Sequence, residues 1–376
     1  MSVLGARAEK GPWSLRSTLD SEPANSMNGR RHALKVVLLS PILLSLARTT
    51  RADASLDVEA LKKGYRRRLA GKLAAGALPY IDIESSADST RLDIDALAKD
   101  IDELDVGMMA LSADITGRQF AQGARWNPLS SRLMEKYPDR FVPVGNGGVP
   151  PVWTKDPEAF LDEYEKQIRS GGYLLMGEFE FRHYPSPRQV QRGALDRDVS
   201  VPIDGPLGHR VFDLSQRSGL SFQIHYEVED PLLAPLETML AQYRKAKVIW
   251  CHVGQVRYIE RAAKYSPAYL EGLINKYPNL YFDTAFGGPN SIYPLSGQRH
   301  ARVWGDLGGL RKDWLDLFVA HPQRFLAALD LGGDRIHRVR EWDLGLRAFL
   351  KRLPHETQRQ VAYRSAWKLL FDEEFA

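Results

Sequence analysis

The stretch Val248-Ile249-Trp250-Cys251-His252 is a short apolar run that ends in a histidine. Two other runs in the second half of the chain have the same form, Phe222-Gln223-Ile224-His225 and Phe325-Leu326-Ala327-Ala328-Leu329-Asp330. Short apolar runs of this kind predict buried strands of a parallel sheet. A (β/α)8 barrel carries its catalytic groups at the carboxyl ends of its strands. A single buried histidine is more often a hydrogen-bonded core residue, so it is the shared position of the three polar residues that favours a metal-centred enzyme site.

Strand and helix patterns alternate from Pro79 onward. Eight strands are predicted, at residues 80–84, 106–111, 141–144, 174–179, 221–225, 248–252, 280–283 and 325–330. Amphipathic stretches predict helices at 93–104, 157–169, 232–244 and 258–276, and an outer helix at 55–77. Eight alternating strands favour an α/β fold of the (β/α)8 TIM-barrel type. The alternative, an open doubly wound sheet, would carry a glycine-rich dinucleotide motif after its first strand, and the sequence has none there.

Two segments are longer than barrel loops usually need. Residues 181–211 follow the fourth predicted strand, and residues 284–312 follow the seventh. Both should open onto the carboxyl face, where we expect them to cover a substrate pocket. The alternative is that they are variable surface loops.

Composition and charge are those of an ordinary globular chain. The chain has 376 residues, a formal net charge of +4 and a single cysteine, Cys251. Much of the basic excess lies in the first seventy residues, so charge gives no reason to expect nucleic acid as a partner. A single cysteine excludes an intrachain disulfide.

Residues 27–54 have the pattern of an export signal, in which basic Arg30-Arg31 precede a short apolar run from Val36 to Leu46. Ala52-Asp53-Ala54 supplies a small-residue cleavage pattern, and the segment from Arg30 to Lys35 resembles a twin-arginine motif. The apolar run is too short to act as a stable membrane anchor. We therefore expect residues 1–54 to be a leader and signal peptide, residues 55–376 to be one barrel domain, and the mature protein to be periplasmic or secreted. A short buried helix with basic flanks is the alternative.

Several short motifs, taken in their order along the chain, resemble the amidohydrolase superfamily, specifically its amidohydrolase-related branch. These are Tyr137-Pro138-Asp139-Arg140-Phe141, Cys251-His252-Val253-Gly254, Asn279-Leu280-Tyr281-Phe282-Asp283, His321-Pro322-Gln323-Arg324-Phe325 and the tail from Ala362 to Leu370. The resemblance covers about residues 79–371. It implies a distorted (β/α)8 barrel, a metal-dependent hydrolase or non-oxidative decarboxylase, a small-molecule substrate and a homodimer.

The resemblance also implies a set of metal ligands. Most members end the first strand in His-x-His, whereas this chain has Glu84 and Ser86 at those positions. Some decarboxylases of the branch have Glu at the first position, so Glu84 is expected to bind the ion together with His225 and Asp330, and Glu178 is a candidate bridging ligand. A carboxylate-rich set favours Mn²⁺, with Zn²⁺ as the alternative. Glu178 could instead be a structural acid.

The implied chemistry is carried by Asp330 and His252. Asp330 is expected to accept a proton from the attacking water, and His252 to stabilise the developing oxyanion or bind the metal. Our leading expectation is a hydrolase of amide, ester or lactone bonds that uses a metal-activated water. A decarboxylase of aromatic or unsaturated acids is the second reading, and a barrel retained as a non-catalytic binding protein is the third.

Overall fold

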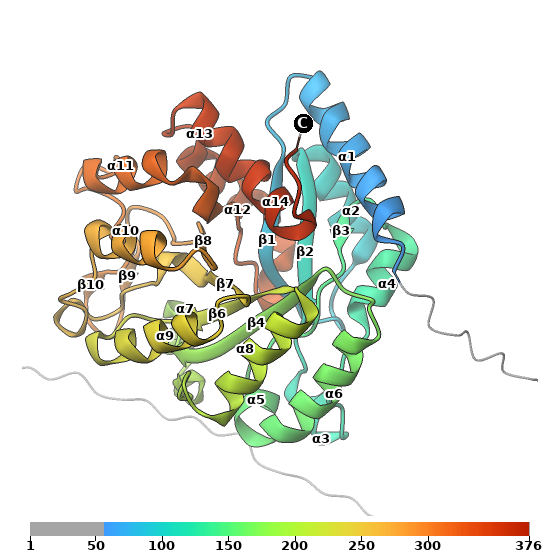
Figure 1. Ribbon diagram of the computed structural model, residues 1–376, viewed down its shortest axis with the longest axis horizontal. Helices are drawn as coiled ribbons and strands as arrows, with labels where there is room; N and C mark the ends of the chain where they lie inside the picture. Colours follow the sequence, from blue (N-terminus) through green and yellow to red (C-terminus); the bar gives the residue numbers. More distant parts are fainter. Residues whose placement is uncertain (1–55, 376) are drawn as a thin grey trace, which may run out of the picture. The chain divides into compact units, whose positions relative to one another are not determined.

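The computed structural model describes residues 56–375 of the chain (Figure 1). The predicted leader and cleavage site therefore lie outside the described residues. No helix in the described part is both long and apolar enough to cross a membrane.

The strands form two main sheets. The first has the order β1 (Tyr80–Ala87), β2 (Val106–Ala113), β3 (Phe141–Val142), and both of its pairings are parallel. The second has the order β11 (Phe325–Leu326), β8 (Leu280–Asp283), β7 (Lys247–Trp250), β6 (Ser221–Tyr226), β4 (Leu175–His183), β5 (Val199–Ser200). Only the edge strand β5 is antiparallel in that sheet. A small antiparallel hairpin joins β9 (Ile292–Tyr293) to β10 (Gln298–Arg299).

The expected barrel is present in part, because the two main sheets meet through isolated bridges and not through continuous ladders. On one side, Ser85 of β1 bridges Leu331, and Asp330 donates its backbone N–H to the Glu84 carbonyl at 3.1 Å. On the other side, Val144 bridges Leu175, and Gly148 bridges Phe179. Strands β3 and β11 have two residues each, and this shortness leaves both seams without a regular ladder. The fold is thus α/β with mainly parallel sheets.

Helices pack around these sheets (Figure 1). They are α1 (Val58–Ala74), α2 (Ile94–Glu103), α3 (Gly117–Ala121), α4 (Leu129–Lys136), α5 (Val152–Lys155), α6 (Pro157–Arg169), α7 (Pro187–Gln191), α8 (Pro206–Ser218), α9 (Asp230–Gln242), α10 (Pro267–Lys276), α11 (Lys312–Ala320), α12 (Val339–Leu350), α13 (His355–Arg359) and α14 (Ser365–Phe371). Short 3₁₀ and π segments complete the chain. The predicted helices at 55–77, 93–104, 157–169, 232–244 and 258–276 correspond to α1, α2, α6, α9 and α10, the last beginning nine residues later than expected.

Local sequence explains several helix ends. The Asp93 carboxylate accepts hydrogen bonds from the N–H groups of Asp95 and Ala96, which would otherwise be unpaired in the first turn of α2. Gly219 ends α8 at φ 75°, a left-handed conformation that costs glycine little. Helices and strands bury large side chains in one continuous core, including Trp153 of α5, Trp250 of β7 and Trp367 of α14.

Candidate metal centre

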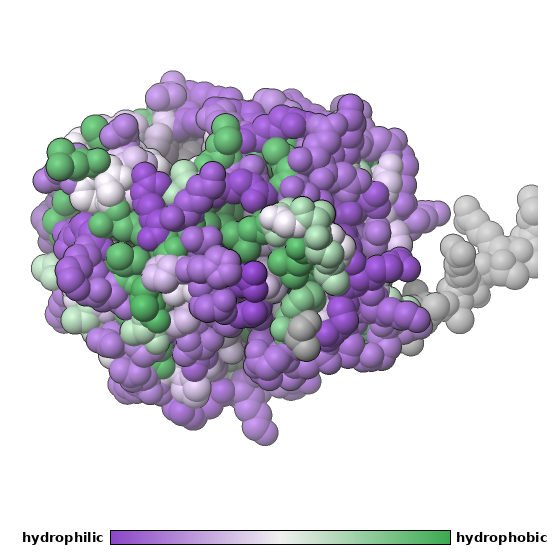
Figure 2. All heavy atoms as spheres, turned by 90° about the horizontal axis from the view of Figure 1, so that it is seen from above, coloured by the Kyte–Doolittle hydropathy of each residue, from purple (hydrophilic) through white to green (hydrophobic). Residues whose placement is uncertain are grey.

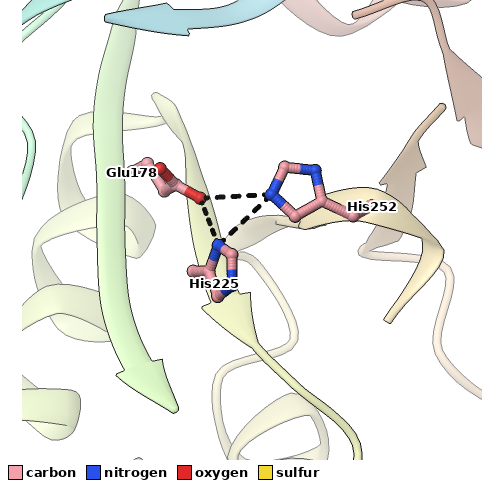
Figure 3. A group of neighbouring side chains, drawn as sticks. All are labelled: Glu178, His225 and His252. Atoms are coloured by element: carbon pink, nitrogen blue, oxygen red, sulfur yellow. Dashed lines mark hydrogen bonds and ion pairs between the residues drawn. The ribbon is translucent and has the colours of Figure 1, made fainter. Parts of the chain in front are cut away.

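Three side chains from neighbouring parts of the second sheet point their ligand atoms at one another (Figure 3). Glu178 comes from β4, His225 from β6, and His252 from the turn after β7. His225 Nδ1 lies 3.0 Å from Glu178 Oε1 and 3.2 Å from His252 Nε2. Glu178 Oε1 lies 3.9 Å from His252 Nε2. The sequence-predicted residues Glu178, His225 and His252 are therefore brought together.

The spacing of these three atoms suits a shared divalent ion. Bonds of about 2.0 to 2.2 Å in tetrahedral arrangement place neighbouring ligand atoms roughly 3.3 Å apart. The observed separations of 3.0, 3.2 and 3.9 Å lie around that value. Two imidazoles and a carboxylate are also a donor set that Zn²⁺ and Mn²⁺ accept.

The second nitrogen of His225 is held by a residue that the sequence did not single out. Glu227, which is 1% exposed, lies with Oε1 3.2 Å from His225 Nε2. The same oxygen accepts a hydrogen bond from Arg257 Nε at 3.0 Å. A carboxylate on one imidazole nitrogen fixes the ring and makes the other nitrogen a better ligand. Nδ1 is therefore the atom that His225 presents to Glu178 and His252.

A second group shares His252 with the first. Glu84 of β1 and Asp283 at the end of β8 bring their carboxylates to His252, with ligand atoms within 4.8 Å of one another. Asp283 Oδ1 accepts the backbone N–H of His252 at 2.9 Å and that of Ala285 at 3.0 Å. Among the described residues, Glu84 Oε2, Asp283 Oδ2 and His252 Nδ1 are buried without a hydrogen-bond partner. Buried polar atoms are rarely left unpaired, so these three indicate a position for a bound cation.

The electrostatics of the centre point the same way. Burial raises the pKa of Glu84 well above its usual range, and the charges of Asp330, Glu178 and Asp283 raise it further. Burial also raises the pKa of Glu178, but its hydrogen bond to His225 and the charges of His225 and His252 outweigh burial and lower that pKa. Several carboxylates thus crowd two imidazoles, and a divalent cation would relieve their mutual repulsion.

Asp330 belongs to neither group of ligand atoms. Its carboxylate accepts a hydrogen bond from Arg335 Nη2 at 2.9 Å, although its charge acts on both Glu84 and His252. It lines the same cavity as Glu84. The structure therefore places Asp330 beside the centre, and its predicted role as a metal ligand stays a prediction.

The predicted strand positions of His252 and Asp330 are wrong. Strand β7 ends at Trp250 and β11 at Leu326, so both residues lie in the following turns. His252 has φ 58° and Asp330 φ 50°, which is left-handed backbone that non-glycine residues adopt at a cost of about 1 to 3 kcal/mol. A strand cannot contain that conformation, and the turn is what redirects each side chain toward the centre.

Other residues discussed from the sequence have structural partners. Ser86 Oγ lies 3.1 Å from Asp114 Oδ2 and belongs to neither ligand group. Glu180 and His183 are buried in β4, where Glu180 forms an ion pair with Arg197. Arg182 is also buried in β4 and pairs with Asp198 and Glu229.

Asp283 and Glu227 are the functional candidates that the sequence interpretation missed. Asp283 had a detectable signal, because it is a polar residue at the carboxyl end of an apolar strand, as is His225. Glu227 follows His225 by two residues in a loop and had no such signal.

A cavity of about 1040 Å³ opens beside the centre and is lined by Glu84, Glu178, His225 and Asp330. Both long segments contribute to its wall, as expected for loops on the carboxyl face. The first supplies residues of α7 together with Arg197, and the second supplies a run from Thr284 to Pro289 with His300 and Trp304. On the face shown in Figure 2, apolar residues form patches between mainly hydrophilic ones.

Comparison with solved structures finds 42 matching chains. They include 4-oxalomesaconate hydratase from Rhodopseudomonas palustris, with 14% identity, 82% of this chain and 91% of that chain covered, and a TM-score of 0.46. Amidohydrolase 2 from Bifidobacterium longum subsp. infantis has 14% identity, coverage of 78% and 99%, and a TM-score of 0.44. The 5-carboxyvanillate decarboxylase from Novosphingobium aromaticivorans, complexed with manganese and 4-hydroxy-3-methoxy-5-nitrobenzoic acid, has 14% identity, coverage of 78% and 96%, and a TM-score of 0.45.

The names of these structures include an amidohydrolase, a decarboxylase and a hydratase. No protein-family model and no curated protein matches the chain. At these identities and TM-scores, no residue role or substrate passes from those proteins to this one, so the function is argued from the side chains described above.

Proposed function

We propose that this protein is a metal-dependent hydrolase that acts on an amide, ester or lactone bond of a small molecule. The observation that carries the proposal is the pair of ligand groups, Glu178–His225–His252 and Glu84–His252–Asp283, which share one histidine. They stand at the edge of a cavity large enough for a drug-sized molecule.

The ion would be held by these groups, with Zn²⁺ or Mn²⁺ as the candidate. A divalent ion there would act as a Lewis acid, polarising the substrate carbonyl and making water more acidic. Glu227 would keep His225 in the orientation that presents Nδ1. The Asp330 carboxylate would accept a proton from the attacking water, which its position on the cavity wall and its contact with Arg335 support.

A metal-dependent decarboxylase of an aromatic or unsaturated acid is the second candidate. The specific observation in its favour is Glu84, which gives the second group two carboxylates and one imidazole. Oxygen-rich sites suit Mn²⁺ better than sites made of several imidazoles. Under this reading, Asp330 would act on the substrate itself and not on water.

Metal analysis followed by a substrate screen tests both candidates. Purified protein should contain close to one or two divalent ions per chain, and Glu178→Gln should remove most of them. Esters and lactones would then be assayed for acid release, and carboxylated phenols for bicarbonate release. Absence of bound metal after incubation with Zn²⁺ or Mn²⁺ would reject both enzymatic candidates and leave a binding protein.

Export is a separate proposal that rests on residues 27–54 alone. The mature amino terminus should lie near Asp53 or Ser55, and Arg30→Lys with Arg31→Lys should hold the precursor in the cytoplasm if the twin-arginine route is used. Unchanged export of that variant would argue against the twin-arginine route. A homodimer likewise stays a prediction, which analytical ultracentrifugation would check.

A further inference from the structure

Three buried side chains near the cavity carry polar atoms that nothing in the described residues satisfies. They are Nη1 of Arg257, Nδ1 of His300 and the hydroxyl of Tyr293, and that hydroxyl also lies near Tyr258. Their side chains or residues are 5%, 8% and 0% exposed, respectively. Arg257 and His300 line the cavity wall. Unpaired donors this deeply buried are costly unless a ligand completes them.

The three groups form one cluster. The Arg257 guanidinium lies over the Tyr293 ring, 4.9 Å from its centroid, and the rings of Tyr293 and His300 are 6.5 Å apart. The cluster is anchored through the backbone, because Ser296 Oγ donates to the Arg257 carbonyl at 2.7 Å and His300 N–H donates to the Ser291 carbonyl at 3.2 Å. These groups are therefore held in place before any ligand arrives, which reduces the entropy lost on binding.

The orientation of Arg257 leaves one guanidinium nitrogen, Nη1, for a ligand. Its Nε donates to Glu227 Oε1 at 3.0 Å, and that carboxylate also faces His225 Nε2. Nη1 remains without a partner. The Glu227 carboxylate would thus link the ligand-binding Arg257 to His225. A ligand at Nη1 would be close to the centre but outside both ligand groups.

The donors of the cluster favour an anion, although the ion pair with Glu227 balances part of the Arg257 charge. Arg257 is cationic, and burial together with the Arg257 charge lowers the pKa of His300 to about 3, so this imidazole is neutral at physiological pH. A neutral imidazole can donate from Nδ1, and the Tyr293 hydroxyl can donate as well. The two donors that line the cavity, Arg257 Nη1 and His300 Nδ1, match the two oxygens of a carboxylate.

Aromatic residues also line this cavity. Phe286, Trp304 and Phe349 line the cavity, and the rings of Phe286 and Phe349 meet edge to face with centroids 5.0 Å apart. A ligand that reaches the cluster would therefore place a flat or apolar body against aromatic rings.

We propose that Arg257 and His300, with the Tyr293 ring packed against them, form a carboxylate-binding subsite, and that the substrate carries an apolar or aromatic body with a carboxylate other than the group that reacts. This inference rests on the proposed function for the word substrate, whereas the subsite itself rests on the three side chains. The bound carboxylate would position the substrate by its far end, while the reacting bond faces the metal centre.

Benzoate and its neutral analogue benzamide are suitable probes. Calorimetric titration of the full chain, both loaded with Zn²⁺ and treated with a chelator, should show benzoate binding at least tenfold more tightly than benzamide. The preference should persist in the chelated protein, because the subsite does not need the ion. Equal affinity of the two probes for chelated protein would overturn the proposal.

His300→Phe is the informative variant, since it keeps a ring of similar size and removes the donor without touching a candidate metal ligand. Loss of a hydrogen bond to a charged group should weaken benzoate binding about tenfold. His209→Phe is the matched control, because His209 bonds Tyr243 elsewhere and does not line the cavity. It should leave benzoate binding unchanged. Unaltered benzoate affinity in His300→Phe would reject the subsite.

Arg257→Gln gives a second, independent variant if His300→Phe does not fold, and it should also weaken benzoate binding because it removes the charged donor on the cavity wall. Metal content measured on the same samples separates the two proposals. Protein that binds no metal but shows the His300-dependent benzoate preference would refute the proposed function and retain the subsite. Protein that binds metal but does not distinguish benzoate from benzamide would do the reverse.

Discussion

His225 Nδ1 lies 3.0 Å from Glu178 Oε1, and the two residues come from the adjacent strands β6 and β4. This contact joins β4 to β6 at the point where both strands reach the cavity. It also defines which atoms would surround an ion, because the other ring nitrogen is already occupied by Glu227. Variants at the two residues therefore test the centre most directly.

Glu178→Gln should lower the amount of bound metal by at least tenfold. The amide keeps the size of the side chain but loses the charge and the basicity that a divalent ion requires. Metal content after dialysis, measured by elemental analysis, checks this. Glu158→Gln is the matched control, because Glu158 is largely exposed and pairs with Arg210. Equal metal content in Glu178→Gln and wild type would remove Glu178 from the ligand set.

Glu84→Gln and Asp330→Asn should differ in their effect on metal. Glu84 has an oxygen without a partner, whereas Asp330 already pairs with Arg335. We expect Glu84→Gln to lower metal affinity more than Asp330→Asn, and Asp330→Asn to lower turnover more than metal content. In chelated protein, Glu84→Gln should raise the melting temperature, since it removes a buried carboxylate that other carboxylates repel. The reverse order of metal loss would make Asp330 the stronger ligand.

The stability of chelated protein should fall as the pH rises from 6.5 toward 10. Burial lowers the pKa of His225, but hydrogen bonds to Glu178 and Glu227 outweigh burial and raise that pKa from 6.5 to about 10. The folded state therefore holds this proton more tightly than the unfolded chain. The resulting stabilisation is complete below pH 6.5 and is lost as the pH approaches 10. Melting temperatures across this range check the trend, and His225→Asn should flatten it.

Metal affinity should follow the opposite trend. An ion must displace the proton of His225, so its apparent dissociation constant should fall by up to about tenfold per pH unit over the same range. Titration with a competing chromophoric chelator at several pH values would measure this. An affinity that does not change with pH would show that His225 binds no ion.

Asp82→Ala should destabilise the protein by about 3 kcal/mol. Asp82 accepts hydrogen bonds from Ser85 Oγ at 2.7 Å, from the Leu329 N–H at 2.9 Å and from the Glu84 N–H at 3.3 Å. Alanine would leave these buried donors unpaired, each at a cost of about 1 to 3 kcal/mol. Denaturant unfolding measures the change. Asp82→Asn keeps an acceptor oxygen and should cost less, so equal losses would contradict this explanation.

The sequence was most informative where one apolar run forms one strand. Strands β6 and β8 lie where their apolar runs predicted, and His225 is the penultimate residue of β6, one position from the predicted strand end. The positions of His252 and Asp330 could not be predicted, because their left-handed backbone is imposed by packing and not by glycine. Glu227 contacts His225, and Arg335 contacts Asp330, because of the path that the loops take after the strands. Hydrophobic periodicity does not encode that path.

The sequence pattern of single strands could not predict that the candidate ligands come together. Glu84 and Asp283 are 199 positions apart in the sequence, and their approach depends on how two sheets meet. The motif order predicted that such residues lie near one another, and it included Asp283 without indicating its role. Direct contact between particular atoms is a property of the folded chain, since it depends on packing at both seams.

The seam at Ser85 and Leu331 joins the two sheets that supply the candidate ligands. Glu84 lies in the first sheet, whereas Glu178, His225 and Asp283 belong to the second. An ion held by Glu84 and Asp283 would act as a cross-link between two sheets that are joined at this seam by an isolated bridge and not by a regular ladder. Amide hydrogens at Ser86 and Asp330, which bond across this seam, would then exchange more slowly in loaded protein, so occupancy of the site would set how readily the two halves separate.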